Sequence, residues 1–472
     1  MKIKYLELKD HPVLGNLKLE LFDDEGKVYN TIVFVGENGV GKTSILMEIS
    51  SLAKGVGDEN YLSKVVFELN KKETTALGDD GLGNILSLSK NRQAGIPNNM
   101  YLASIGNRNF SYSTNNYSME PADKLLHRIV VKIRRNDAEP VLNKIRGVSN
   151  NDVDETVSPQ SLKRIVDLNT DLDVAQLLVD LSVKDAVEFR NSFNKTGILD
   201  EALMNKRIGR FENSFNAFFD NKLRFDEVSE TYDVNFIKDG LVFDATKLSS
   251  GEKTIVQSGA ALLKDVYSDE TPLILIDEPE QALHPKWQEH ILGYYQNILS
   301  INPDKDNQLF VTTHSEHVLK EALQKNNVLI IALRREQEGK IKYEKIQNNI
   351  CVLPYISYDE IKCKIFGIAS SDYHDDLLSF IQEETKKNCV DQDKEFRNDN
   401  NCEKVHWNGY DRSGNKRTDW DCETLPLFVR NYYHHPELRK YNKHFKINEE
   451  IINSSINYLE SKVKEIRQNE TV

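Results

Sequence analysis

Three short apolar runs stand out along the chain, and each is followed at once by glycine, acidic or histidine residues. They are Thr31–Val35, Pro272–Asp277 and Gln308–Thr313. Apolar runs of this length, rich in Val, Ile and Leu, are typical of strands buried on both faces of a parallel sheet. Further strands are predicted at Val65–Leu69 and Met100–Ser104, and Met1–Asp10 alternates like a half-buried strand. We therefore expect an α/β protein built on a mixed sheet flanked by helices.

The stretch 115–204 differs from the sheet-forming parts, because it is charged, rich in helix formers and only thinly apolar, as in Leu172–Phe189. This pattern predicts a helical arm inserted into the α/β domain. No apolar heptad continues through three repeats, so a long coiled coil is not expected. The expected division is an N-terminal lobe at 1–114, the arm at 115–204, a second lobe of the same domain at 205–345 and a C-terminal region at 346–472.

The C-terminal region is predicted to be mostly helical. Its last helix, Ile447–Ile466, carries its Ile, Leu and Val side chains on one stripe and is expected to pack against another helix. The polar stretch Asn388–Arg417 is rich in Asn, Asp and Lys, which predicts a loop.

Composition narrows the class of protein. The 472 residues are 39% hydrophobic and 29% charged, which is typical of a soluble globular protein, and no stretch approaches 18 consecutive apolar residues. The start of the chain lacks the apolar core of a signal peptide, and five irregularly spaced cysteines favour reduced thiols. We expect a cytoplasmic protein with no membrane partner. The net charge of −13 repels nucleic acid at long range, which leaves only a local basic face for contact with DNA or RNA.

The strongest chemical signal follows the first apolar run. Residues 36–43 read Gly-Glu-Asn-Gly-Val-Gly-Lys-Thr and satisfy the pattern G-x-x-x-x-G-K-[ST] between a strand and a helix. In such a loop the backbone N–H groups surround phosphate oxygens, the lysine adds a positive charge, and the hydroxyl group binds Mg²⁺. The predicted nucleotide-binding residues are Gly36, Asn38, Gly39, Gly41, Lys42, Thr43 and Ser44. The alternative is a glycine-rich turn that happens to contain a lysine.

The second and third apolar runs end in residues that suit a bound nucleotide. Asp277 and Glu278 follow the Walker B arrangement, in which Asp277 holds Mg²⁺ and Glu278 polarises the attacking water. The third run ends in His314, which is placed to bond the γ-phosphate. Because ligands in open α/β sheets collect at the carboxyl ends of strands, we expect these side chains to meet. The predicted catalytic residues are Lys42, Glu278 and His314, and the predicted metal ligands are Thr43 and Asp277.

Residues 248–253 read Leu-Ser-Ser-Gly-Glu-Lys, which taken alone is a polar turn that caps a helix. Beside the motifs above, this sequence resembles the LSGGQ signature of the ATP-binding-cassette (ABC) superfamily. The sequence of Asp277–Pro285 resembles that of the SMC-like, AAA-21 branch of that superfamily and differs from that of its transporters. The resemblance implies an ABC/SMC-like P-loop ATPase head with a helical arm, which binds ATP and Mg²⁺ and hydrolyses ATP. It adds four nucleotide-binding residues, Ser249, Ser250, Gly251 and Glu252.

In such ATPases the signature of one subunit caps the γ-phosphate held by another. The resemblance therefore implies a homodimer or higher homo-oligomer, joined head to tail with ATP at the seam. The C-terminal segments Phe366–His374 and Thr424–Glu437 are similar to those of PtuA-like ATPases of Septu anti-phage systems, which also occur beside retrons. This similarity implies a regulatory subunit whose nucleotide state controls a partner HNH nuclease of the PtuB kind.

A different interpretation rests on Arg430, Asn431 and His435, which fit the R-N-x-x-x-H pattern of HEPN ribonucleases. In such sites a His and an Arg activate a 2′-hydroxyl group and stabilise a pentavalent phosphate without metal. The chain would then be an ATP-gated ribonuclease toxin. The structural alternative is that Arg430 and His435 only bond backbone at a helix end before Pro436. A third function, in DNA repair or chromosome maintenance, is disfavoured because the chain has no C-x-x-C hook and only a modest arm.

Overall fold

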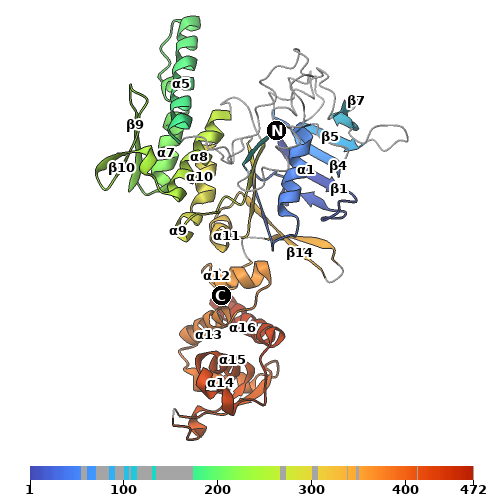
Figure 1. Ribbon diagram of the computed structural model, residues 1–472. Coiled ribbons are helices and arrows are strands. Elements are labelled where there is room, and N and C mark those ends of the chain that lie inside the picture. The colour runs from blue at the N-terminus through green and yellow to red at the C-terminus, as the bar shows by residue number, and fades with distance from the viewer. Residues whose placement is uncertain are drawn as a thin grey trace. The chain divides into compact units, whose positions relative to one another are not determined.

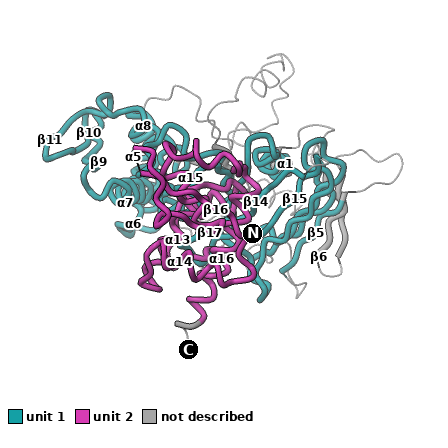
Figure 2. The backbone as a smooth tube through the Cα atoms, turned by 90° about the horizontal axis from the view of Figure 1, so that it is seen from below, with its two compact units in different colours: residues 1–346 teal, residues 347–472 magenta. Residues whose placement is uncertain are grey.

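The computed structural model describes residues 1–54, 61–70, 84–90, 100–105, 108–113, 130–133, 174–265, 273–299, 307–336, 339–346, 350–411 and 413–470. The chain forms two compact units, residues 1–346 and 347–472, coloured separately in Figure 2 and described here one at a time. Within the described residues, no helix is both long and apolar enough to cross a membrane. Residues 115–129 and 134–173 of the predicted arm lie outside the described part of the chain.

A six-stranded sheet forms the centre of the first unit (Figure 1). Its strands are β3 (Thr31–Val35), β8 (Val130–Ile133), β12 (Leu273–Asp277), β13 (Gln308–Thr313), β14 (Val328–Arg335) and β15 (Ile341–Ile346). The order is β15-β14-β3-β13-β12-β8, and all neighbours are parallel except β14 and β15. The three apolar runs are therefore confirmed as adjacent strands of one sheet. They are buried almost throughout, because other elements cover both faces.

A second, antiparallel sheet covers one face of the central sheet, with helix α1 (Lys42–Lys54) between the two (Figure 1). Its strands, in the order β2-β1-β4-β5-β6-β7, include the predicted strands near 65 and 100. One hydrophobic cluster joins Ile45 and Ile49 of α1 to Phe67 of the second sheet and to Phe34 and Phe310 of the central sheet. The bounds are β1 Lys2–Leu8, β2 Lys18–Glu20, β4 Leu62–Glu68, β5 Ile85–Lys90, β6 Met100–Ile105 and β7 Arg108–Ser113.

Helices cover the opposite face of the central sheet (Figure 1). The helices of this part are α5 (Val174–Thr196), α6 (Glu201–Met204), α7 (Ile208–Phe218), α8 (Ser250–Asp265), α9 (Pro285–Gln288), α10 (Ile291–Ile298) and α11 (Glu316–Leu323). A small antiparallel sheet precedes α8, with strands β9 (Leu223–Val228), β10 (Val234–Lys238) and β11 (Leu241–Asp244), followed by the 3-10 turn η1 (Ala245–Lys247).

The sequence predicted a helical arm over 115–204, and this prediction is wrong for part of the range. Strand β8 lies inside this range and pairs in parallel with β12, where it forms the edge of the central sheet. Its sequence, Val-Val-Lys-Ile, is a short β-branched run, and pairing with a buried strand satisfies its backbone groups. The helical part of the prediction applies to α5 and α6.

The second unit is mostly helical, as predicted. Its helix α16 packs along α13 and α15, and the buried Ile456, Leu459 and Val463 lie on the predicted apolar stripe. The elements are α12 (Tyr358–Ile361), η2 (Lys362–Phe366), α13 (Ser371–Thr385), α14 (Cys389–Asn398), β16 (Lys404–Trp407), η3 (Thr418–Trp420), β17 (Cys422–Thr424), α15 (Leu425–His434), η4 (Pro436–Tyr441) and α16 (Glu449–Glu470).

The prediction of a loop over 388–417 is wrong, because this range contains α14 and β16, which is one strand of a two-stranded sheet. Asn388 caps α14 by accepting a hydrogen bond from the Asp391 N–H. Phe396 and Trp407 are buried in the core of the second unit. Two large apolar side chains therefore anchor a segment that is otherwise polar.

A buried carboxylate joins α5 to the start of α7. Asp185 has no exposed surface, and its Oδ2 accepts hydrogen bonds from the N–H groups of Arg207 and Ile208, at 2.7 and 3.0 Å. Its Oδ1 lies 2.8 Å from Nη1 of Arg207, which also contacts Glu188 at 2.7 Å. Asp185 thus caps α7 and neutralises the guanidinium group of Arg207 at the start of that helix.

We expect Asp185→Ala to lower the free energy of unfolding by about 3–5 kcal/mol, because it leaves two buried N–H groups without an acceptor and the buried guanidinium with only the half-exposed Glu188 as its partner. Glu188→Ala is the matched control. Its side chain is 36% exposed, so its loss should cost less than about 1 kcal/mol. Urea unfolding of both variants checks this difference, and equal losses would contradict the role assigned to Asp185.

Candidate nucleotide-binding site

The loop between β3 and α1 has two positions where only glycine fits. A Cβ atom on Gly36, at φ +153°, would lie 2.4 Å from the carbonyl oxygen of Leu333, and one on Gly41, at φ +97°, would lie 2.5 Å from Cδ2 of Leu14. Arg335 of β14 donates a hydrogen bond to the carbonyl oxygen of Gly39 at 2.9 Å. Neighbouring elements on both sides therefore fix the course of this loop. The loop residues Glu37, Asn38 and Gly39 are exposed.

Lys42, the first residue of α1, turns back into this loop. Its Nζ donates hydrogen bonds to the carbonyl oxygens of Gly36 and Glu37, at 2.8 and 3.0 Å, and the residue is only 5% exposed. Burial lowers the pKa of Lys42, against the opposing effect of nearby carboxylates. A buried ammonium among backbone groups at a helix start suits a phosphate group. Thr43 and Ser44 follow in the first turn of α1.

The two residues predicted to hold Mg²⁺ meet at the end of β12. The Thr43 Oγ1 lies 3.0 Å from both carboxylate oxygens of Asp277. Thr312, the neighbour of Asp277 on β13, also donates a hydrogen bond to that carboxylate. The oxygens of a hydroxyl group and a carboxylate are the ligands that Mg²⁺ prefers, so this donor set fits a divalent cation. Thr312 was not predicted, because only strand pairing places it beside Asp277.

Glu278 follows β12 in a conformation that is unusual for its residue type. Its φ is +49°, in the left-handed region, which costs a residue with a Cβ atom about 1–2 kcal/mol. Hydrogen bonds hold it there, because its N–H donates to the carbonyl oxygen and the hydroxyl oxygen of Thr312 and its carboxylate accepts from the Gln281 amide. Strain of this kind gathers at functional sites, which agrees with the catalytic role predicted for Glu278.

His314 lies between two carboxylates at the end of β13. Its Nδ1 is 3.4 Å from Oε1 of Glu278 and 3.6 Å from Oε1 of Glu280. Glu280 is 3% exposed and accepts hydrogen bonds from the Thr313 hydroxyl at 2.7 Å and from the His314 N–H at 3.1 Å. Burial raises the pKa of Glu280 despite these donors. Glu280 therefore positions His314. The one feature of the sequence that could have drawn attention to Glu280 is that it is the third acidic residue within four positions.

The signature-like residues form a separate site at the start of α8. The Glu252 carboxylate accepts a hydrogen bond from the Ser249 N–H at 2.7 Å, and the Ser249 Oγ accepts one from the Glu252 N–H at 3.4 Å. This is a capping box. Lys238 of β10 lies 2.9 Å from the other Glu252 oxygen. Burial would raise the pKa of Glu252, but Lys238 and the Ser249 donors lower it overall, so the carboxylate stays charged.

The ring of Trp287, in α9, packs against Gly251 of this signature. A Cβ atom on Gly251 would lie 2.8 Å from the Trp287 ring and 3.4 Å from the carbonyl oxygen of Ala282. No hydrogen bond or ion pair within the described ranges joins residues 249–252 to the loop 36–44. The signature and the phosphate loop of one chain are therefore not joined directly by these interactions.

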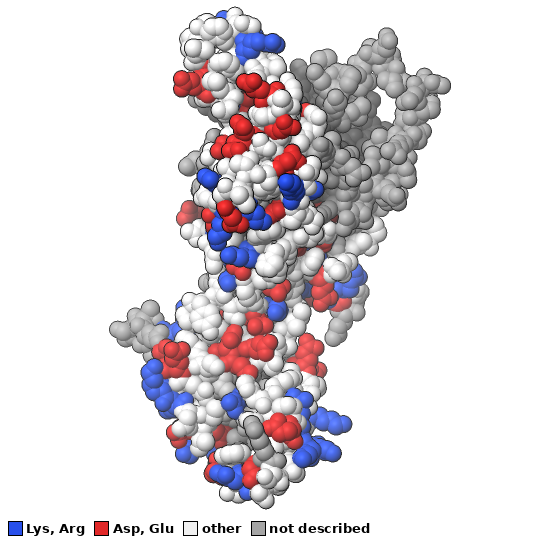
Figure 3. Space-filling model, turned by 60° about the vertical axis from the view of Figure 1, so that its left-hand side comes forward, with Lys and Arg blue, Asp and Glu red and all other residues white. Residues whose placement is uncertain are grey.

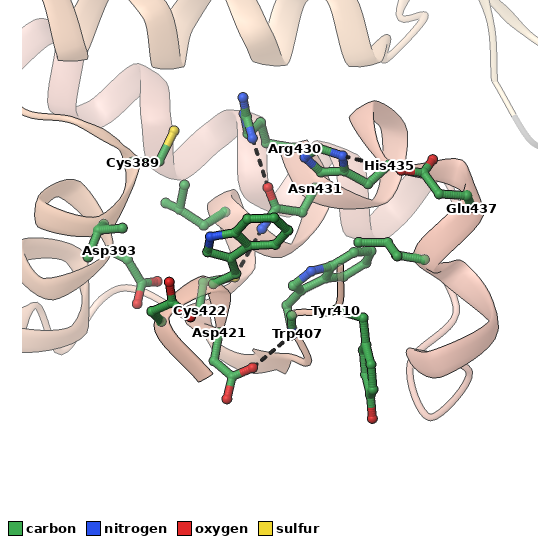
Figure 4. A pocket seen from close by; sticks show the side chains of 16 residues that line it. Cys389, Asp393, Trp407, Tyr410, Asp421, Cys422, Arg430, Asn431, His435 and Glu437 are labelled. Carbon is green, nitrogen blue, oxygen red and sulfur yellow. Dashed lines mark hydrogen bonds and ion pairs between the residues drawn. The ribbon is translucent and has the colours of Figure 1, made fainter. Parts of the chain in front are cut away.

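The three residues of the ribonuclease interpretation line one cavity in the second unit (Figure 4). Arg430 and Asn431 lie on α15, where Arg430 Nη1 donates to the Asn431 Oδ1 at 2.9 Å, and His435 follows the helix with its Nδ1 3.7 Å from Glu437. Neither contact is to backbone. RNA cleavage by these residues stays a prediction.

The face shown in Figure 3 bears on contact with nucleic acid. Lys and Arg alternate there with Asp and Glu over the described surface, and no wide basic area is formed by the described residues on this face. The DNA or RNA contact that the sequence left open stays a prediction.

Comparison with known proteins identifies the family. The family described as "AAA domain, putative AbiEii toxin, Type IV TA system" matches residues 32–320, more than half of the chain, and the chain belongs to this family. The Septu protein PtuA of Bacillus thuringiensis is 28% identical over 144 residues, a match that spans 28% of this chain and only about a third, 34%, of PtuA. The predicted P-loop ATPase and its resemblance to PtuA-like proteins are confirmed.

Solved structures of SMC heads also match the chain. The SMC head domain of Thermotoga maritima has 14% identity and a TM-score of 0.37, and the match covers 74% of this chain and all of that one. The Smc head of Pyrococcus furiosus, bound to the C-terminal domain of ScpA, has 13% identity and a TM-score of 0.39, over 73% of this chain and 96% of that one. Members of the matched family bind a nucleotide with a divalent metal ion.

We expect Glu278→Gln to lower kcat for ATP hydrolysis at least about 100-fold while nucleotide binding is retained, because the amide cannot accept a proton from the attacking water. Glu344→Gln, an exposed carboxylate of β15, is the control and should leave kcat unchanged. Steady-state phosphate release and equilibrium nucleotide binding measure the two effects. Wild-type turnover by Glu278→Gln would exclude this carboxylate as the base.

Glu280 predicts a pH dependence of stability. Burial raises the pKa of Glu280 in the folded state. Above that raised pKa the ionised carboxylate lowers the free energy of unfolding, and this loss of stability disappears as the pH falls toward the ordinary Glu pKa of about 4.3. Glu280→Gln removes this titration. The melting temperature of the variant should exceed that of the wild type most at pH 8, and the difference should shrink toward pH 4. A difference independent of pH would contradict the assignment.

Proposed function

We propose that the chain binds ATP and Mg²⁺ at the carboxyl ends of β3, β12 and β13, and that the nucleotide state controls a partner nuclease in an anti-phage complex. The observation that carries the first part is the meeting of Lys42, Thr43, Asp277, Glu278 and His314 at one edge of the sheet. These residues supply the charge, the metal ligands and the base that phosphoryl transfer needs.

Each side chain has a step that its geometry suits. Lys42 and the N–H groups of the loop bind the phosphates, and Thr43 and Asp277 would hold Mg²⁺, which would supply positive charge against that of the phosphates. Glu278 takes the proton of the attacking water. His314, held by Glu280, donates a hydrogen bond to the γ-phosphate. The strained backbone of Glu278 keeps its carboxylate at the sheet edge instead of in a relaxed loop.

The separation of the signature from the phosphate loop supports assembly of two chains around each nucleotide. Ser249 caps a 16-residue helix that begins with Ser250 and Gly251, and the first N–H groups of this helix are suited to a phosphate. In the described part of one chain, Ser249 and Ser250 form hydrogen bonds with Glu252, Lys253 and Thr254 of the same helix. We infer that they cap the nucleotide of a second chain, so that ATP favours the closed pair of heads and hydrolysis releases it.

Control of a partner nuclease rests on the similarity to the Septu protein PtuA. We infer that an HNH nuclease of the PtuB kind is the partner and that the second unit transmits the nucleotide state to it. This unit has its own hydrophobic core and is joined to the ATPase head at residues 346–347. A separate core is the usual property of a part that can change its position relative to a head.

The decisive assay incubates the purified chain with plasmid DNA and with total RNA, with Mg²⁺, and with or without ATP. We expect ATP hydrolysis and intact nucleic acids from the chain alone, and ATP-dependent DNA cleavage once the HNH partner is added. Lys42→Ala should abolish the ATP-dependent DNA cleavage, and His435→Ala should leave this cleavage unchanged. RNA cleavage by the wild type that is lost in His435→Ala would instead favour the ribonuclease toxin.

A further inference from the structure

A cavity of about 370 Å³ lies in the second unit, among α14, the paired strands β16 and β17, and the end of α15 (Figure 4). Pockets of this size hold small organic ligands. Its lining combines aromatic rings, one guanidinium group, one imidazole and several carboxylates. None of these residues belongs to the proposed ATP site, so the cavity needs an explanation of its own.

One side of the cavity carries the guanidinium group of Arg430 and, beside His435, the carboxylate of Glu437. Arg430, Asn431 and His435 lie together on this side (Figure 4). The neutral amide of Asn431 accepts the hydrogen bond from Arg430, and among the described residues no carboxylate lies within ion-pair distance of that guanidinium. Burial and the neighbouring Arg430 lower the pKa of His435, against the opposing effect of Glu437, whose Oε1 lies 3.7 Å from the His435 Nδ1. This side suits a phosphate group.

The other side of the cavity carries carboxylates in two different states (Figure 4). Asp393 is fully engaged, because it accepts hydrogen bonds from two donors of β17 and pairs with Arg397 at 2.8 Å. Asp421 accepts from the Gly409 N–H through Oδ1 at 2.7 Å, and no hydrogen bond to its Oδ2 is present in the part of the chain described. Asp421 therefore has an oxygen available for an N–H donor of a ligand.

Aromatic rings line the cavity between these two sides. Trp407 is 1% exposed, whereas Trp420, at the end of the turn η3, is 49% exposed and has the Arg417 guanidinium over one face of its ring. A Cβ atom on Gly409 would lie 2.5 Å from Cβ of Trp420, so glycine is needed to bring that turn close. Tyr410 stacks on Tyr441 with ring centroids 3.9 Å apart, which fixes its ring. Rigid aromatic rings of this kind are surfaces on which a flat heterocycle stacks.

We propose that this cavity binds a nucleoside monophosphate group whose base carries an amino group, with the phosphate at Arg430 and the amino group at Asp421. An anionic end, a flat ring and a hydrogen-bond donor at the far end are the chemistry of guanine, adenine and cytosine nucleotides. A basic peptide would satisfy Asp421 but would be repelled by Arg430. The same chemistry is offered by a free nucleotide and by the 5′-phosphorylated end of a single strand.

Calorimetry on the full chain tests this assignment, with the ATP site saturated by a nonhydrolysable ATP analogue. The probes are GMP, UMP and a 5′-phosphorylated ribohexamer that begins with G. We expect GMP to bind at least tenfold more tightly than UMP, because uracil has no amino group to pair with Asp421. Arg430→Gln should weaken GMP binding at least tenfold and Arg430→Lys less, whereas Lys443→Gln, an exposed charge outside the cavity, should change nothing. Asp421→Asn should reduce the preference for GMP over UMP.

Equal binding of GMP and the hexamer would assign the cavity to strand ends, and binding of GMP alone would assign it to a free nucleotide. The proposal is wrong if the wild type binds none of the probes, or if Arg430→Gln, shown to be folded by circular dichroism, binds GMP as the wild type does. A lysine-rich peptide that binds the wild type and is lost in Asp421→Asn would also overturn it, in favour of a protein segment. These outcomes do not depend on ATP turnover.

Discussion

The parallel register of β3, β13 and β12 is the constraint on which the proposed ATP site depends. Thr313 pairs with Val35 and Thr312 with Asp277, so that all three strands end at the same edge of the sheet. The phosphate loop, the predicted metal ligands and His314 follow from these ends. A slip of one residue between β12 and β13 would remove Thr312 from the Asp277 carboxylate and turn the side chains to the other face.

Close backbone packing connects this edge to the signature. The segment after Glu278 turns through Ala282, at φ +58°, and leads to Trp287, whose ring lies against Gly251. The position of the signature helix is therefore coupled by direct contact to the segment that follows the proposed base. A change at the γ-phosphate has a short physical path to the surface where we infer that a second chain binds.

The sequence predicted the parts of the fold that local patterns determine. Continuous apolar runs identified β3, β12 and β13, and their polar ends identified Lys42, Asp277 and His314. The pattern failed where packing decides: β8 has only four residues and is a strand because β12 offers it a partner, and α14 forms in a polar stretch because Phe396 reaches the core. Glu280 was missed for the same reason, since nothing in its local sequence shows that Thr313 and His314 surround it.

The central claim is that each nucleotide is shared between two chains, and mixing two inactive chains tests it most directly. Lys42→Ala disables the phosphate loop, and Ser249→Asp keeps α8 capped while it places a negative charge in the signature. In head-to-tail pairs, chains co-expressed in equal amounts form some sites from one intact loop and one intact signature. We expect each variant alone to be inactive and the mixture to recover about a quarter of wild-type ATP turnover. A mixture of folded chains that stays inactive would contradict the shared site.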